Sequence, residues 1–321
     1  MPDAIQLPVE KYRGAVREVT LGAGPDAGGS RKKVVTVGGE TTLPFLFFEG
    51  KMPNRPVVAV EIAERAPERW PEMLLSAWGK ATGDVAEWAR AAEEAGADLI
   101  VLQVQDGDGA LPAQEIATRS RAILQACGLP LIVVGPGAAE RDNEILVAVA
   151  DATAGERLAL GRCEEKNYRT IVAAALANGH NVIAASPIDV NLAKQLNILI
   201  RDMNLPLDRV LMDPTTGALG YGVEYTYSVM ERLRLAALQG DEMTQQPMIC
   251  FVGQESWRQK EARAVEGVPA EWGPYATRAI LWEVITATAL LHSGADIVVL
   301  RHPESVRLVR WAIDELMSGQ V

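Results

Sequence analysis

A polar, glycine-rich stretch that follows an apolar segment carries the residue types best suited to binding. Residues 210–212 are apolar and strand-like, and Asp213-Pro214 ends the strand because proline cannot donate a hydrogen bond to a neighbouring strand. Glycine permits positive φ and lets a bulky partner lie against the backbone, so the stretch predicts a binding loop. The alternative is a simple turn without a ligand, which is common for glycine-rich loops after strands. The residues after the proline that define the loop are Thr215, Thr216, Gly217, Gly220, Tyr221 and Gly222.

The polar residues at the ends of the predicted strands include six neutral hydrogen-bonding groups and seven ionisable groups. A hydrolase needs a paired acid and base, or a nucleophile beside a base, and Asp213 with Glu255 is the one carboxylate pair that neighbouring strands would bring together. Asp213 before Pro-Thr-Thr is equally typical of a residue that caps its own turn. Without G-x-S-x-G, H-E-x-x-H or a phosphate loop, the pattern predicts a site for a polar-edged ligand. The neutral residues are Gln103, Gln105, Ser186, Thr215, Thr216 and Gln254, and the ionisable ones are Asp106, Asp108, Asp189, Asp213, Glu255, Arg301 and His302.

Composition narrows the class of protein. The 321 residues carry a formal net charge of −11 without a clustered basic surface, which argues against nucleic-acid binding. No run of eighteen apolar residues occurs and the first residues do not resemble a signal peptide, so we expect a soluble, cytoplasmic protein without a membrane partner. The three cysteines have no C-x-x-C spacing, which predicts small core residues rather than a disulfide, zinc or iron–sulfur site.

One unit repeats eight times from residue 57 onward: an apolar strand followed by an amphipathic helix. Such alternation predicts a parallel sheet covered by helices, and eight units in about 265 residues match a closed (β/α)8 TIM barrel over 57–321. An open doubly wound sheet is disfavoured because no G-x-G-x-x-G follows the first strand. The strands are expected at 57–63, 97–105, 130–137, 158–163, 181–187, 209–214, 247–254 and 295–303, and the helices at 84–95, 112–127, 143–154, 168–178, 190–203, 223–239, 274–293 and 304–318.

Residues 1–56 differ from the barrel repeat and are expected to form an N-terminal extension. Two β-branched segments, 15–21 and 32–40, flank a glycine-rich turn and predict a β-hairpin. Residues 43–48 contain three of the four phenylalanines. This apolar patch either plugs one end of the barrel or contacts a partner chain.

Two long loops at the expected carboxyl face of the barrel, 64–83 and 255–273, contain Trp70, Trp78, Trp257 and Trp272. Large aromatic side chains gathered on one face indicate a broad apolar occupant, such as a flat cofactor or a protein partner. The alternative is that the loops bury their own tryptophans.

Two segments resemble one family closely. Residues 211–243 read LMDPTTGALGYGVEYTYSVMERLRLAALQGDEM, and residues 253–262 read GQESWRQKEA. Both resemble the small subunit of the corrinoid iron–sulfur protein, also called the delta subunit of the acetyl-CoA decarbonylase/synthase complex. The resemblance covers nearly the whole chain, beginning at VREVTLGAG in the N-terminal extension.

The resemblance implies a TIM barrel of the pterin-methyltransferase type that pairs with a large corrinoid iron–sulfur subunit. The two chains together would hold a cobamide, a cobalamin-type corrinoid, while the iron–sulfur cluster would belong to the large subunit alone. This heterodimer would take a methyl group from methyltetrahydrofolate through a separate methyltransferase. It would deliver the methyl group to acetyl-CoA synthase/CO dehydrogenase in the anaerobic acetyl-CoA (Wood–Ljungdahl) pathway of carbon fixation.

A corrin is broad, flat and mostly apolar with amides at its rim, so it suits neutral hydrogen-bonding groups and glycine-rich surface, while the cobalt supplies the chemistry. No catalytic residue and no metal ligand is assigned, and His302 is left out because the family's cobalt is expected to lack a protein imidazole. Two alternatives remain, a methyltetrahydrofolate-dependent methyltransferase acting alone, with Asp213 holding the pterin, and a scaffold. The expected cofactor-binding residues are Ser186, Asp213, Thr215, Thr216, Gly217, Gly220, Tyr221, Gln254, Glu255 and Arg301.

Overall fold

The computed structural model describes residues 8–107 and 109–319. Asp108 and the first seven residues of the expected N-terminal extension lie outside these ranges. Eight parallel strands close into a barrel in the order β10-β3-β4-β5-β6-β7-β8-β9. This confirms the predicted (β/α)8 fold. The strands are β3 (Val57–Ile62), β4 (Leu99–Gln103), β5 (Leu131–Val134), β6 (Ala159–Cys163), β7 (Asn181–Ala185), β8 (Val210–Asp213), β9 (Met248–Cys250) and β10 (Ala295–Leu300).

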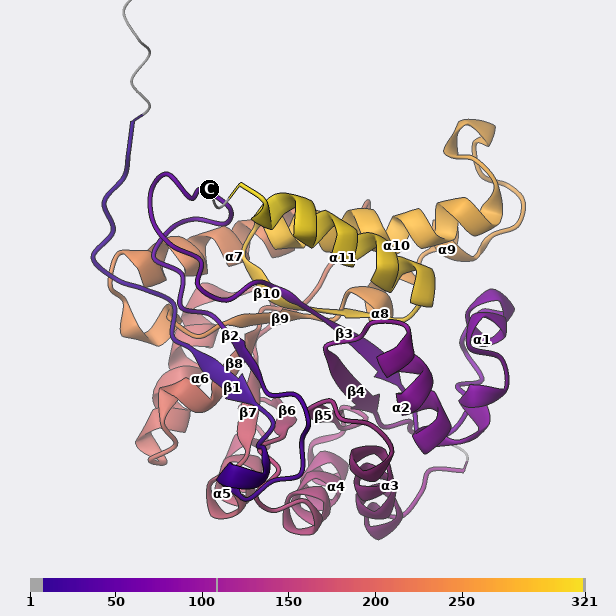
Figure 1. Ribbon diagram of the computed structural model, residues 1–321, viewed down its shortest axis with the longest axis horizontal. Helices are drawn as coiled ribbons and strands as arrows, with labels where there is room; N and C mark the ends of the chain where they lie inside the picture. Colours follow the sequence, from indigo (N-terminus) through magenta and orange to yellow (C-terminus); the bar gives the residue numbers. More distant parts are fainter. Residues whose placement is uncertain (1–7, 108, 320–321) are drawn as a thin grey trace, which may run out of the picture.

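The outer layer consists of helices that bury an apolar face against the barrel (Figure 1). Several begin and end as their sequences predict: the Asp84 and Asp189 carboxylates cap helices, and Gly179 ends one with φ of 81°. No helix within the described ranges has the length and apolarity needed to cross a bilayer. The long helices are α2 (Val85–Glu94), α3 (Ala113–Ala126), α4 (Ala139–Ala152), α5 (Tyr168–Asn178), α6 (Val190–Asp202), α7 (Val223–Leu238), α10 (Tyr275–His292) and α11 (Pro303–Met317).

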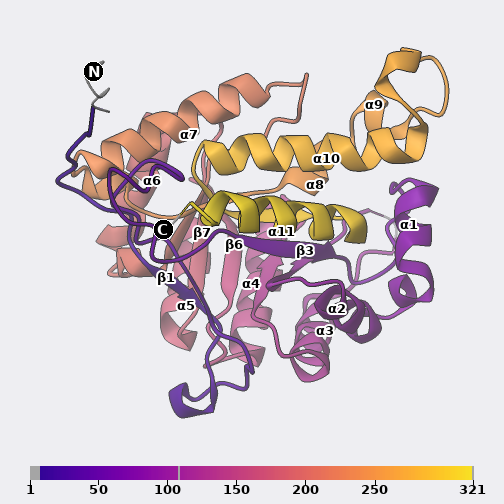
Figure 2. The ribbon, with the colours of Figure 1, turned by 45° about the horizontal axis from the view of Figure 1, so that its top comes forward.

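The two long loops contain short helices that the sequence pattern did not predict. These are α1 (Glu72–Trp78) after β3, and α8 (Val252–Ser256) and α9 (Lys260–Arg263) after β9. The strand expected at 247–254 is therefore wrong beyond Cys250, and Gln254 and Glu255 lie on α8. In Figures 1 and 2, α1 and α9 project from the side opposite the N-terminal segment, beyond the carboxyl ends of the strands.

The predicted hairpin forms from β1 (Val19–Leu21) and β2 (Val35–Val37), which pair antiparallel. Their inward side chains share one buried cluster with the interior of the barrel, so the hairpin closes its amino-terminal end. Residues 43–48 form turns rather than a strand. Phe45 packs edge-on against His292 with ring centroids 5.6 Å apart, whereas Phe48 is half exposed.

The tryptophans of the long loops are mostly buried by their own chain. Trp70, Trp78 and Trp257 are each at least nine-tenths buried, and only Trp272 is substantially exposed, at 44%. Of the two alternatives, the structure shows the second for three of the four tryptophans: the loops bury them because they fold back onto the barrel mouth. The Trp78 indole, for example, donates a 2.7 Å hydrogen bond to the Arg301 carbonyl.

Candidate functional site

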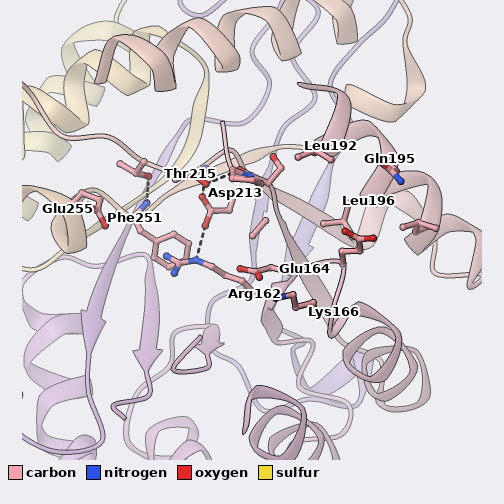
Figure 3. A pocket seen from close by; sticks show the side chains of 16 residues that line it. Arg162, Glu164, Lys166, Leu192, Gln195, Leu196, Asp213, Thr215, Phe251 and Glu255 are labelled. Atoms are coloured by element: carbon pink, nitrogen blue, oxygen red, sulfur yellow. Dashed lines mark hydrogen bonds and ion pairs between the residues drawn. The ribbon is translucent and has the colours of Figure 1, made fainter. Parts of the chain in front are cut away.

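A cavity of about 410 Å³ opens at the carboxyl ends of β6 to β9. In (β/α)8 barrels this end carries the ligand-binding loops. Its rim residues Glu164, Glu165 and Lys166 are exposed, so the cavity opens to solvent. Figure 3 shows the lining side chains, which are Arg162, Glu164, Glu165, Lys166, Ala185, Ser186, Pro187, Leu192, Gln195, Leu196, Leu199, Asp213, Thr215, Thr216, Phe251 and Glu255.

Arg162, near the end of β6, connects three neighbouring elements at the base of the cavity. Its Nε donates to Asp213 Oδ2 at 2.8 Å, and its Nη2 donates to Gln254 Oε1 at 2.9 Å. The guanidinium carbon lies 4.1 Å from the ring centroid of Phe251. This residue was not among those predicted from the sequence. The available signal was a charged residue near the end of an otherwise apolar strand segment.

Asp213 is fixed by its own turn as well as by Arg162. Its Oδ1 accepts a 2.9 Å hydrogen bond from the Thr215 backbone N–H, which is the predicted turn cap. Thr215 has φ of +69° and donates its hydroxyl to the Ser186 carbonyl at 2.8 Å, and Thr216 Oγ1 accepts from the Phe251 N–H at 2.9 Å. These bonds join β7, β8 and β9 at the cavity floor.

Five of the ten predicted site residues line this cavity, namely Ser186, Asp213, Thr215, Thr216 and Glu255, and Gln254 joins it through Arg162. The proposed carboxylate pair takes a different form. Asp213 is paired with Arg162, and Glu255 Oε1 lies 3.0 Å from Arg258 Nη1. Each carboxylate thus has its own arginine.

The glycine-rich loop lines the cavity only through Thr215 and Thr216, and its later residues shape the site from outside the lining. A side chain at Gly217 would place its Cβ 2.5 Å from the Gly222 carbonyl carbon, so the loop closes on itself there. Gly220 adopts φ of +75°. Tyr221 is exposed, and its hydroxyl lies 3.1 Å from Glu261 Oε1.

Arg301 lies at the barrel mouth but outside the lining of the cavity. Its Nη2 donates a 2.6 Å hydrogen bond to Glu61 Oε1, and its guanidinium carbon lies 4.7 Å from the centroid of Trp70. Register explains the pairing, because Leu300 is opposite Val60 in adjacent parallel strands. Arg301 therefore stabilises the junction of β10 and β3.

His302 is a helix cap. Its Nδ1 accepts from the Glu304 N–H at 3.1 Å at the start of α11, and its ring stacks on Trp257 at 5.9 Å. Burial lowers the pKa of His302 to about 4. The ring is neutral at pH 7 and its Nδ1 lone pair is occupied.

The described residues offer no group of three or more His, Cys, Asp or Glu side chains arranged to hold a metal ion. All three cysteines are buried and free, as predicted for core residues. Burial raises the pKa of Cys163 and of Cys250, so both remain thiols at neutral pH.

The cavity has one apolar wall and one polar wall. Leu192, Leu196 and Leu199 lie at helical spacing on α6, and in Figure 3 the first two lie across the cavity from Phe251 and Glu255. Four carboxylates line it, against two cations, Arg162 and Lys166. This arrangement suits an uncharged ligand that donates hydrogen bonds and presents an apolar edge.

Known proteins resemble this chain in sequence and in fold. The family model for the CO dehydrogenase/acetyl-CoA synthase delta subunit matches residues 18–311. The acetyl-CoA decarbonylase/synthase complex subunit delta of Archaeoglobus fulgidus is 36% identical in an alignment 325 positions long, which covers 97% of this chain and 70% of that protein. The corresponding subunit of Methanopyrus kandleri is 38% identical in an alignment 313 positions long, which covers 96% of this chain and 77% of that protein.

Solved structures of dihydropteroate synthases share the barrel. The enzyme from Coxiella burnetii, in complex with pteroic acid, has a TM-score of 0.57 at 14% identity and covers 95% of this chain and 99% of its own. The enzyme from Thermus thermophilus has a TM-score of 0.54 at 16% identity and covers 86% of this chain and 99% of its own. Identities this low show the fold alone.

The family match and the identities to its members together confirm the resemblance inferred from residues 211–243 and 253–262. They also connect the chain with the acetyl-CoA pathway. This chain belongs to the CO dehydrogenase/acetyl-CoA synthase delta subunit family.

Proposed function

We propose that this chain is the small subunit of a heterodimeric corrinoid methyl carrier and holds a cobamide at its interface with a large iron–sulfur subunit. The methyl group would come from methyltetrahydrofolate through a methyltransferase and pass to acetyl-CoA synthase/CO dehydrogenase. Family membership supports the place in the acetyl-CoA pathway. The observation that carries the proposal is the open cavity at the carboxyl ends of β6 to β9, with its leucine wall and its hydroxyl and carboxylate wall.

The donor and acceptor groups of the cavity fit a corrinoid edge. Corrin side-chain amides donate hydrogen bonds, and the carboxylates of Asp213 and Glu255 accept them, while Ser186 and Thr215 contribute hydroxyls. The leucines of α6 suit the apolar ring edge. When bound, the cobalt supplies the methyl-transfer chemistry, and this chain positions and shields the ring.

The cavity has room for only part of so broad a ligand. We infer that the rest extends over the barrel mouth and is covered by the large subunit. Gly220 and Tyr221 would then contact only the parts of the ligand outside the cavity, and Arg301 would act by fixing the mouth. The iron–sulfur cluster is assigned to the partner.

A charge placed on the apolar wall tests this assignment. Leu192 is 42% exposed and lines the cavity, so Leu192→Glu should leave the fold intact and lower the cobalt content of the heterodimer at least threefold. The matched control is Ile198→Glu, a residue of the same helix that is 36% exposed and is not among the lining residues. Equal cobalt in both variants would remove the cavity from the corrinoid site.

The volume of the cavity keeps one other function open. About 410 Å³ lies within the roughly 300–1,000 Å³ typical of small-molecule sites, so a pterin-dependent methyltransferase acting alone is the second candidate. Equilibrium binding of methyltetrahydrofolate to the isolated chain, without any corrinoid protein, would favour it. Absence of binding at millimolar concentration would exclude it.

A further inference from the structure

The guanidinium of Arg162 is held in one orientation. Asp213 accepts from its Nε and Gln254 accepts from its Nη2, while Phe251 covers one of its faces at 4.1 Å. Asp213 is itself fixed by the Thr215 N–H, and its side chain is only 4% exposed. Two in-plane hydrogen bonds and one stacked ring leave the plane of the guanidinium little freedom to rotate.

The other face of this guanidinium is open to the cavity. Phe251 is 1% exposed and lies beneath it, yet the Arg162 side chain retains 28% of its exposure and lines the cavity. A planar guanidinium stacks on flat π-systems, which a lysine ammonium cannot do in the same way. Arg162 therefore presents a preformed stacking surface.

An aliphatic wall faces this surface. Leu192 and Leu196 of α6 lie on the opposite side of the cavity from Phe251 (Figure 3), and Leu199 of the same helix also lines the cavity. A cationic plane on one side and branched aliphatic side chains on the other favour a flat ring between them.

The charges select against an anionic group in this space. The charge of Arg162 is already balanced by Asp213, and that of Glu255 by Arg258, which leaves Glu164 and Glu165 against Lys166. A phosphate or carboxylate entering the cavity would meet more negative than positive charge. Such a group belongs at the rim or beyond it.

We propose that the cavity contains a stacking slot for a flat, uncharged nitrogen heterocycle, with Arg162 as its platform and the α6 leucines as its opposite wall. The inference rests on the proposed function and on its alternative, which between them supply two sources of such a ring. One is the lower base of the cobamide, and the other is the pterin of the methyl donor.

Binding of free rings to the isolated full-length chain tests the slot. The probes are α-ribazole, the nucleoside of a cobamide lower base, and 6-methyltetrahydropterin, measured by calorimetry. We expect at least one to bind, and we expect α-ribazole phosphate to bind no more tightly than α-ribazole. Failure of both uncharged rings to bind at millimolar concentration would overturn the proposal, as would tighter binding of the phosphate.

Two pairs of variants assign the binding to the slot. Arg162→Lys keeps the charge and loses the plane, so binding should weaken about tenfold, whereas Arg169→Lys, at an exposed arginine on α5 outside the lining, should change nothing. Leu192→Trp should fill the slot and abolish binding without disturbing the Arg162 hydrogen bonds, while Ile198→Trp should not. Wild-type binding in both Arg162→Lys and Leu192→Trp would refute the slot.

Corrinoid retention by the heterodimer distinguishes the two sources. If the lower base occupies the slot, Arg162→Lys should reduce retention of cobalamin but not of cobinamide, which lacks that base. If a pterin occupies it, both corrinoids should be retained and only pterin binding should weaken. Equal loss of both corrinoids would overturn the slot, because Arg162 would then contact the corrin ring. A wild-type heterodimer without corrinoid would refute the proposed function. Ring binding to the isolated chain would still show whether the stacking slot exists.

Discussion

Replacing Glu40 by glutamine perturbs a buried charge cluster that ties the N-terminal segment to the barrel. Arg234 of α7 lies 3.2 Å from Glu40 Oε2 through Nη1 and 2.8 Å from Asp296 Oδ2 through Nη2. All three side chains are at most 5% exposed. One buried cation therefore faces two carboxylates, and ionising both would leave an unbalanced negative charge.

Burial, together with the Asp296 charge, raises the pKa of Glu40 from its ordinary value of 4.5 to about 8, although Arg234 opposes the shift. In the folded protein Glu40 is therefore protonated at pH 7, whereas in the unfolded chain it is ionised. Its contribution to the free energy of unfolding is complete below about pH 4.5 and falls by about 1.4 kcal/mol per pH unit up to about pH 8. Glutamine mimics the protonated acid and removes this dependence.

Urea unfolding of the wild type and of Glu40→Gln at pH 5.5, 6.5 and 7.5 measures the effect. Relative to the wild type, the variant should gain about 3 kcal/mol of unfolding free energy between pH 5.5 and pH 7.5, which is two units at about 1.4 kcal/mol each. Asp26→Asn, at an exposed carboxylate of the same segment, should show no such gain. If the unfolding free energies of the wild type and of Glu40→Gln differed by the same amount at all three pH values, the conclusion that Glu40 is protonated in the folded protein would be refuted.

Three further changes test the local structure around the site. Thr216→Val leaves the buried Phe251 N–H without its acceptor and should lower the free energy of unfolding by about 1–3 kcal/mol in urea titrations; an unchanged midpoint would contradict the bond. Gly217→Ala forces a Cβ against the Gly222 carbonyl and should open the loop, which limited proteolysis would detect as faster cleavage than in a Gly83→Ala control whose Cβ meets no atom within 4 Å. The His302 imidazole should stay neutral until about pH 4, so its contribution to stability is lost as the pH falls from 6.5 to 4; imidazole NMR showing a midpoint near 6.5 would contradict its burial.

The barrel was predictable because its signal is local and repeated. Each strand is a short apolar run and several helices carry a cap residue at one end, as at Asp84 and Gly179, so errors at single boundaries did not change the count. The hairpin was predictable for the same reason: in β1 and β2 a half-buried threonine sits between two buried apolar residues.

The site was only partly predictable, because its pairings join residues far apart in the sequence. Arg162 meets Asp213 across 51 positions and Gln254 across 92, and nothing local to 158–163 indicates either partner. Arg301 was assigned to the ligand because it follows a strand. Closure of the barrel pairs it with Glu61, 240 positions away, which the sequence did not indicate, and its contact with a ligand stays a prediction.

The most direct test of the central claim is to co-express this chain with the proposed large subunit, anaerobically and with cobalamin, and to measure cobalt content and the visible spectrum against this chain alone. We expect cobalt and corrinoid bands only when both chains are present. A preparation without corrinoid in either form, together with binding of methyltetrahydrofolate by this chain alone, would contradict the carrier function and establish the pterin methyltransferase instead.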